Sequence, residues 1–163
     1  MYRHGHIGVG LSLYAPVAYG LLSSGRTVLA AVGFVTMVWL AMIPDFDTKT
    51  GLLTHRGATH TLAFAVVFGA VCGVIGWLLG TRLVRFSPRM LAGFAFGLGM
   101  LAVLSHLLAD WLTPMGIAPF WPVSSRRYSL NLARASNTAA NSLLFFLGLG
   151  ATVGALWFAG SIG

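Results

Sequence analysis

The sequence predicts an all-α fold: an integral membrane helical bundle of about five transmembrane helices, formed as one domain over residues 1–163. Composition is the first reason, because 57% of the residues are hydrophobic and 8% are charged, against about 25% charged residues in average soluble domains. The second reason is that the apolar residues gather in five runs close to the roughly 20 residues that span a bilayer. We therefore expect a multi-pass protein of the cell membrane.

The five apolar runs cover residues 6–23, 27–44, 58–80, 90–112 and 139–160. The first run is the weakest, since Gly, Ser, Tyr and Pro interrupt it, but we interpret it as a retained helix rather than a cleaved signal sequence. In the later runs, glycines four residues apart favour close helix approach within the bundle. These pairs are Gly69/Gly73, Gly76/Gly80, Gly93/Gly97 and Gly150/Gly154.

The net charge of +7 comes from ten Lys and Arg against three acids. In a soluble protein this balance would suggest nucleic-acid binding. Here the basic residues lie mostly between the apolar runs, where such residues anchor helices at lipid headgroups. We expect membrane lipid as a partner and no nucleic acid.

If the five runs cross the membrane in alternating directions, all histidines and acids lie at or near helix ends on one side of it. A charged residue at a helix centre costs about 2.5–3.5 kcal/mol by insertion scales, so such residues tend to face the protein interior and have partners. The set is His4, His6, Asp45, Asp47, His55, His60, His106 and Asp110.

Two segments each hold a pair of side chains that could bind a metal ion together. His106 and Asp110 are four residues apart and share one helical face, from which both can reach one metal ion or two adjacent ions. In "PDFD", residues 44–47, Pro44 favours an extended backbone that would point Asp45 and Asp47 to the same side. Each segment alone also fits an ordinary hydrogen bond or turn.

The remaining histidines complete the pattern. The side chains of His4 and His6 would point the same way if the backbone were extended, whereas in a helix only one of them could act as a metal ligand. His55 and His60 fit one residue on a loop and one in a first helical turn. Taken together, the set favours a divalent-metal site. Two divalent cations would supply +4 against the −3 of the three carboxylates, and a mixed His/Asp set suits Zn²⁺, Mn²⁺ or Fe²⁺ better than Ca²⁺.

Four segments resemble the YdjM-like family of membrane-bound, metal-dependent hydrolases: "HGHIGVG" (4–10), "PDFD" (44–47), "HRGATHTL" (55–62) and "SHLLADWLTPMGIAPFWPVSSRRYSL" (105–130). That family is distantly similar to the zinc-dependent phospholipase C and single-strand nuclease superfamily, whose members cleave phosphoesters. The resemblance implies metal-ligand roles for His6, one or both of Asp45 and Asp47, His60, His106 and Asp110. The soluble enzymes use further downstream ligands for three zinc ions. This chain has no His or acid after Asp110, so one or two ions, with zinc favoured, are expected.

The expected activity is metal-assisted hydrolysis of a phosphoester in a lipid or lipid-linked substrate, in which a bound metal lowers the pKa of water to about 7. His55 is a candidate for moving protons. Arg56, Arg126 and Arg127 are candidates for binding phosphate oxygens, with headgroup anchoring as an equally supported role. The alternatives are a divalent-metal transporter, a metal-stabilised structural membrane protein and a lipid amidase.

Overall fold

A computed structural model describes residues 1–46, 56–83 and 85–161 of the chain. Its elements, in chain order, are α1 (Arg3–Ser23), α2 (Thr27–Leu40), the 3₁₀ helices η1 (Pro44–Phe46) and η2 (Ala58–His60), α4 (Leu62–Gly80), α5 (Pro88–Trp111) and α6 (Thr138–Gly160). Among the described residues, five helical segments are long and apolar enough to cross a membrane, the second of them being Thr27–Phe46, which joins α2 and η1. This confirms the predicted five-helix bundle.

Three of these helices begin at a polar side chain that caps them. The side chains of Thr61, Ser87 and Asn137 each accept a hydrogen bond from the backbone N–H three residues later, at the starts of α4, α5 and α6. Such caps satisfy N–H groups that have no partner within the helix. In α5 the cap is followed by Pro88, whose fixed φ suits the first helical position.

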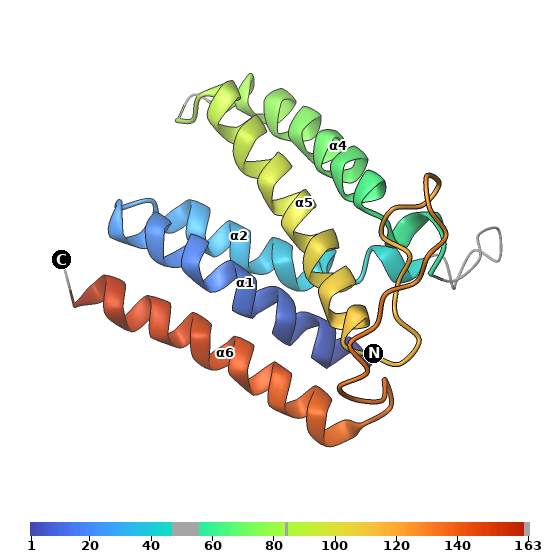
Figure 1. Cartoon of the computed structure of the whole chain (residues 1–163). Helices are drawn as coiled ribbons and strands as arrows, with labels where there is room; N and C mark the ends of the chain where they lie inside the picture. The colour runs from blue at the N-terminus through green and yellow to red at the C-terminus, as the bar shows by residue number, and fades with distance from the viewer. Residues whose placement is uncertain (47–55, 84, 162–163) are drawn as a thin grey trace.

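Helix α1 is central to the bundle, because it packs against α2, α5 and α6 (Figure 1). Its Tyr14 is fully buried and donates a hydrogen bond of 2.8 Å to the carbonyl of Ala30 in α2. Tyr14 packs with Met37 and Ala102 in a core between α1, α2 and α5. This core holds α1 against the helix that carries His106 and Asp110.

Glycines allow the closest helix contacts. A Cβ atom added at Gly8 would collide with the backbone of α6, and one added at Gly148 would collide with the backbone of Gly8. In α4, Gly69, Gly73, Gly76 and Gly80 all face α5 or the residue that opens it, as the spacing predicted.

The same interpretation is wrong for two of the predicted glycine pairs. A Cβ atom at Gly93, Gly97, Gly150 or Gly154 would meet no heavy atom within 4 Å. At these four positions no described residue packs closely against the glycine, so spacing alone did not identify the packed face.

The polar ends of the elements meet at one end of the bundle (Figure 1). The N-terminus, the end of α2, the start of α4, the end of α5 and the start of α6 lie there, and the C-terminus lies at the opposite end. Threading the helices alternately through a membrane produces this arrangement, as the sequence predicted.

Candidate metal centre

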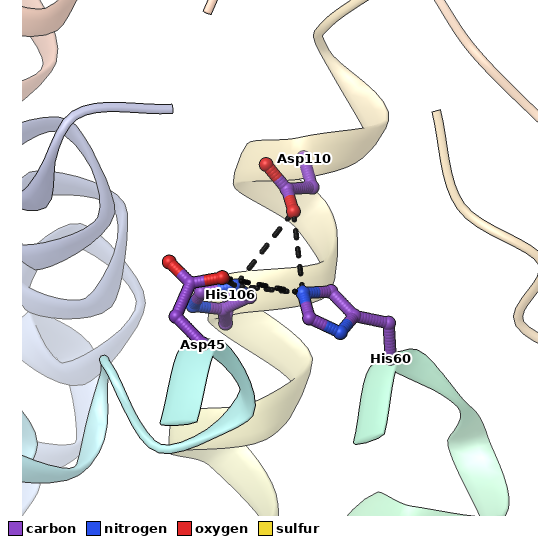
Figure 2. Close-up of side chains that lie close together, drawn as sticks. All are labelled: Asp45, His60, His106 and Asp110. Atoms are coloured by element: carbon purple, nitrogen blue, oxygen red, sulfur yellow. Dashed lines mark hydrogen bonds and ion pairs between the residues drawn. The ribbon is translucent and has the colours of Figure 1, made fainter. Parts of the chain in front are cut away.

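Four side chains from three elements converge at this end of the bundle (Figure 2). Asp45 comes from η1, His60 from η2, and His106 and Asp110 from the last turns of α5. Each offers one ligand atom, and the four atoms lie within 4.8 Å of one another. The Nε2 atoms of the two histidines are 3.2 Å apart. Asp45 Oδ1 lies 3.3 Å from His106 Nε2 and 3.5 Å from His60 Nε2. We call these four residues the metal-ligand group.

Both histidines of the group are oriented by contacts at their outer nitrogens. His106 Nδ1 lies 2.7 Å from the carbonyl oxygen of Ala41. A carbonyl only accepts hydrogen bonds, so Nδ1 donates and the neutral ring directs the Nε2 lone pair into the group. His60 Nδ1 lies 3.0 Å from Thr59 Oγ1, and its Nε2 also points inward. Outer contacts of this kind are typical of metal-ligating histidines.

Asp110 uses its two oxygens differently. Oδ1 accepts a hydrogen bond of 2.6 Å from Arg56 Nη2 and lies 3.3 Å from the Met1 nitrogen. Oδ2 faces His60 Nε2 at 3.5 Å, and among the described residues this buried oxygen has no hydrogen-bond partner. A buried carboxylate oxygen without a donor is unusual in a folded protein. A cation between the imidazole nitrogens and the carboxylates would satisfy it, so the residues fit a metal ion.

His6 lies directly beside the group. Its fully buried ring stacks on His106 with ring centroids 3.9 Å apart and planes 3° from parallel, and its Nε2 is 3.7 Å from Asp110 Oδ1. Neither ring nitrogen has a hydrogen-bond partner in the described part of the chain. His6 is therefore placed to add a further nitrogen next to the four ligand atoms.

His4 does not join the group. Both histidines belong to helix α1 rather than to an extended segment, and residues two apart in a helix point about 200° apart. The His4 ring lies against Phe145 of α6, with ring centroids 6.5 Å apart. A helical backbone here was predicted to leave only one of these two histidines able to act as a ligand, and that one is His6.

The prediction of an extended "PDFD" segment was wrong. Pro44–Phe46 form a 3₁₀ helix in which the N–H of Phe46 donates to the carbonyl of Ile43. The tight turn after α2 still brings Asp45 into the group, where it is the most exposed member, with 22% of its side chain accessible. Asp47 and His55, predicted as a ligand and a proton carrier, lie outside the described residues.

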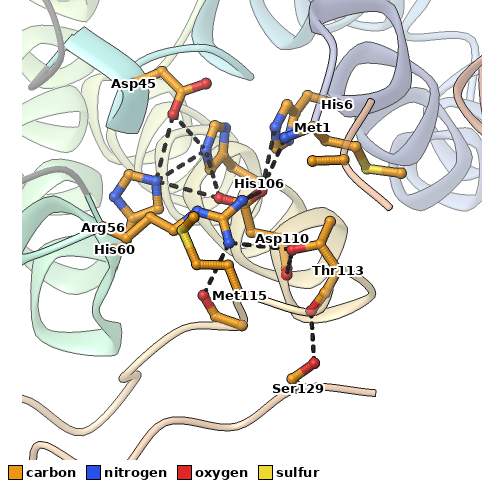
Figure 3. A network of polar contacts seen from close by, with 12 residues as sticks. Met1, His6, Asp45, Arg56, His60, His106, Asp110, Thr113, Met115 and Ser129 are labelled. Atoms are coloured by element: carbon orange, nitrogen blue, oxygen red, sulfur yellow. Dashed lines mark hydrogen bonds and ion pairs between the residues drawn. The ribbon is translucent and has the colours of Figure 1, made fainter. Parts of the chain in front are cut away.

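Arg56 is a buried partner of the group rather than an exposed phosphate contact. Besides Asp110, its guanidinium donates to Thr113 Oγ1 and to the carbonyl of Gly116, both at 3.1 Å (Figure 3). Its exposed fraction is 4%. Arg56 therefore ties the end of α5 to the connection that follows it, and Ser129 strengthens that tie through a hydrogen bond of 2.6 Å to the Thr113 carbonyl.

The structure does not bring Arg126 and Arg127 into the metal-ligand group. Both are exposed on the connection between α5 and α6. The guanidinium carbon of Arg126 lies 5.4 Å from the centre of the Tyr128 ring, and Arg127 Nη1 is 3.5 Å from the carbonyl of Met115.

Ala41 and Thr113 contact the site but were not among the residues predicted from the sequence. Ala41 acts through a carbonyl at the end of α2, where helix carbonyls lack partners, and side-chain patterns do not reveal such a role. Thr113 follows Asp110 by three residues, a helical spacing that could have indicated it.

Comparisons with known proteins agree with the membrane fold. A family model described as YdjM inner membrane protein matches residues 1–162. The inner membrane protein YbcI of Escherichia coli (strain K12) is 29% identical over an alignment of 125 residues, and the match covers 69% of this chain and 66% of that protein. The chain thus spans slightly less than two thirds of this relative's length. No solved structure matches the chain. With a match across nearly its whole length, the chain belongs to the YdjM inner membrane protein family.

Proposed function

We propose that this protein is a membrane-embedded, metal-dependent hydrolase that cleaves a phosphoester of a lipid or lipid-linked substrate. The observation that carries the proposal is the metal-ligand group, in which two imidazoles and two carboxylates gather at one end of a transmembrane bundle. One buried carboxylate oxygen of the group, Asp110 Oδ2, has no hydrogen-bond donor among the described residues. Buried ionisable residues in a membrane protein point to a functional site.

The group would hold its metal through Asp45, His60, His106 and Asp110. Two histidines and two aspartates in one small cluster suit Zn²⁺, with Mn²⁺ and Fe²⁺ as alternatives, and water would bind at a fifth position or in place of one carboxylate. His6 stacks on His106 and would be a ligand for a second ion next to the first. A bound divalent cation supplies acidified water and charge stabilisation for a phosphoryl oxygen.

The protein's own residues would orient and shield this chemistry. The Ala41 carbonyl and Thr59 hold the two histidines, while Arg56 fixes Asp110 and offsets its charge. His60, His106 and Asp110 are almost completely buried, whereas Asp45 is partly accessible. We infer that substrate approaches past Asp45.

Phosphoester chemistry is proposed from the resemblance of the sequence segments to the YdjM-like family and, through that family, to phospholipase C-type enzymes. A lipid substrate is supported by the position of the site at the end of a membrane bundle. A transporter would need ligands along a path through the membrane. The described histidines and aspartates all lie towards one end of the bundle, which favours catalysis over transport.

The test is hydrolysis by purified protein loaded separately with Zn²⁺, Mn²⁺ or Fe²⁺. The panel contains phospholipids, polyprenyl phosphates and N-acylated lipids, the last to detect an amidase. We expect turnover of a phosphoester that is lost in His60→Ala and retained in Arg82→Gln, an exposed residue at the other end of the bundle. A metal-loaded protein inactive on the whole panel, beside an active control phospholipase, would refute the proposal.

A further inference from the structure

An apolar pocket lies next to the metal-ligand group. It has a volume of about 420 Å³ and is enclosed by the start of α4, the end of α5 and the connection between α5 and α6. Its lining is hydrocarbon apart from the Tyr128 hydroxyl and the Trp111 indole nitrogen. Such a lining favours a ligand part that is itself apolar.

The pocket and the metal-ligand group share a wall. Leu107 lines the pocket and directly follows His106 on α5, and Leu62 lines it two residues after His60. Successive residues of a helix turn by about 100°, so the buried Leu107 lies on the flank of α5 between the face of the two ligands and the face that lines the pocket. A ligand in the pocket would therefore lie beside the metal centre.

The pocket opens at the surface of the bundle, beside the start of α4 and the end of α5. Trp111 and Phe120 at its edge are 38% and 50% exposed, and the Phe120 ring meets the Tyr128 ring edge to face at 5.8 Å. Aromatic residues are enriched where hydrocarbon meets headgroups. A lipid chain can reach such an opening from the bilayer without crossing water.

Positive charge lies at the rim of the pocket. The Arg126 guanidinium sits over the ring of Tyr128, a lining residue, and is exposed. Guanidinium groups match the geometry of phosphate oxygens. An apolar pocket with an arginine at its rim is complementary to a hydrocarbon chain that carries a phosphate.

We propose that this pocket seats one acyl chain of an anionic glycerophospholipid, with Arg126 contacting its headgroup from the rim. The volume suits a single acyl chain better than the many isoprene units of a polyprenyl tail. This inference rests on the proposed function, because it names the substrate class of the metal centre.

The test is photo-crosslinking of the purified full chain, in nanodiscs, with phosphatidylglycerol carrying a diazirine in one acyl chain. Labelled peptides are mapped by mass spectrometry, first without added metal so that binding is measured apart from hydrolysis. We expect labelling at pocket residues such as Leu104 and Leu108, reduced at least fivefold in Leu108→Trp, which fills the pocket.

A second apolar pocket provides the matched control. It has a volume of about 390 Å³ and lies between α2, α4 and α5. Ile75→Trp in that pocket is expected to leave labelling at Leu104 and Leu108 unchanged. Equal labelling of the wild type and Leu108→Trp would mean that the probe reacts from the lipid around the protein rather than from the pocket. That result would overturn the proposal.

Arg126→Gln tests the headgroup and, as an exposed change, leaves the fold intact. We expect it to weaken labelling by phosphatidylglycerol at least threefold but not labelling by a phosphatidylcholine probe, with Arg89→Gln at the far end of α5 as control. Preferential labelling by a polyprenyl phosphate probe would overturn the acyl-chain assignment. Pocket labelling in a protein that binds no metal would reject the hydrolase while leaving lipid binding established.

Discussion

Asp110 joins the metal-ligand group to the rest of the protein. One oxygen is held by Arg56 and the other faces the histidines. Removing one partner of a buried ion pair leaves an uncompensated charge, which destabilises a protein by about 3–5 kcal/mol. We expect Arg56→Gln to lower the free energy of unfolding by about this amount, measured by reversible unfolding in mixed micelles. Arg127→Gln, an exposed change, should stay within about 0.5 kcal/mol of the wild type. Equal stability of the two variants would contradict the structural role of Arg56.

His6 and His4 provide a matched test within one helix, because only His6 reaches the metal-ligand group. Replacing a residue that supports a metal site typically weakens metal binding 10–100-fold. We expect His6→Ala to weaken Zn²⁺ binding about tenfold or more, and His4→Ala to change it less than twofold. Competition with a chromophoric chelator measures both values. A larger loss in His4→Ala would mean that the face of α1 has been assigned incorrectly.

At the residue scale, sequence spacing could predict features that depend only on the geometry of one helix. The pair His106 and Asp110 shares a face because four residues make about one helical turn. The burial of Arg56 could not be predicted, since it depends on where the connection after α5 folds back. The contact of His106 with Ala41 likewise depends on packing between α5 and the end of α2.

Among the helices, the contact of α1 with α6 positions His6. Asn141 of α6 accepts a hydrogen bond of 2.9 Å from the N–H of Tyr2, at the start of α1. Further along, the backbones meet at Gly8 and Gly148. Overpacking a tight contact costs typically about 1–3 kcal/mol.

We therefore expect Gly148→Ala to lower the unfolding free energy by about 1–3 kcal/mol and to weaken metal binding through the displacement of His6. The control is Gly150→Ala on the same helix, because a Cβ atom there meets open space. Thermal unfolding in detergent and chelator competition are the two measurements. Equal behaviour of the two variants would show that the α1–α6 contact does not position the site.

Element types could be predicted from the apolar runs, but the packing faces could not. The pairs of glycines within α5 and α6 suggested contacts that the structure does not contain, whereas the contact at Gly8 and Gly148 uses one glycine from each helix. The predicted run 27–44 also exceeds α2, which ends at Leu40 before the chain turns into η1. Apolar residues such as Ala41 and Ile43 continue the hydrophobic signal beyond the helix.

At the scale of the whole molecule, five spans place the metal-ligand group and the basic connection after α5 at one end. This arrangement predicts that Ser125 and the N-terminus lie on one side of the membrane and Arg85 on the other. Single cysteines at Ser125 and Arg85 should therefore react from opposite sides with a membrane-impermeant maleimide, applied to intact cells and to inverted vesicles. The wild type, whose native Cys72 lies within α4, measures the background labelling. Labelling of both positions from one side would contradict the five-span topology.

The central claim is that the buried histidines and aspartates bind a metal ion, and metal content tests it most directly. Wild type and His106→Ala would be purified in mild detergent without chelator or affinity-tag metal and measured by elemental analysis, with His4→Ala as the control. We expect one or two zinc, manganese or iron ions per wild-type and His4→Ala chain, and loss of metal in His106→Ala. A folded wild type that holds no metal, even after reconstitution, would contradict the account and leave the group as a buried hydrogen-bonded cluster.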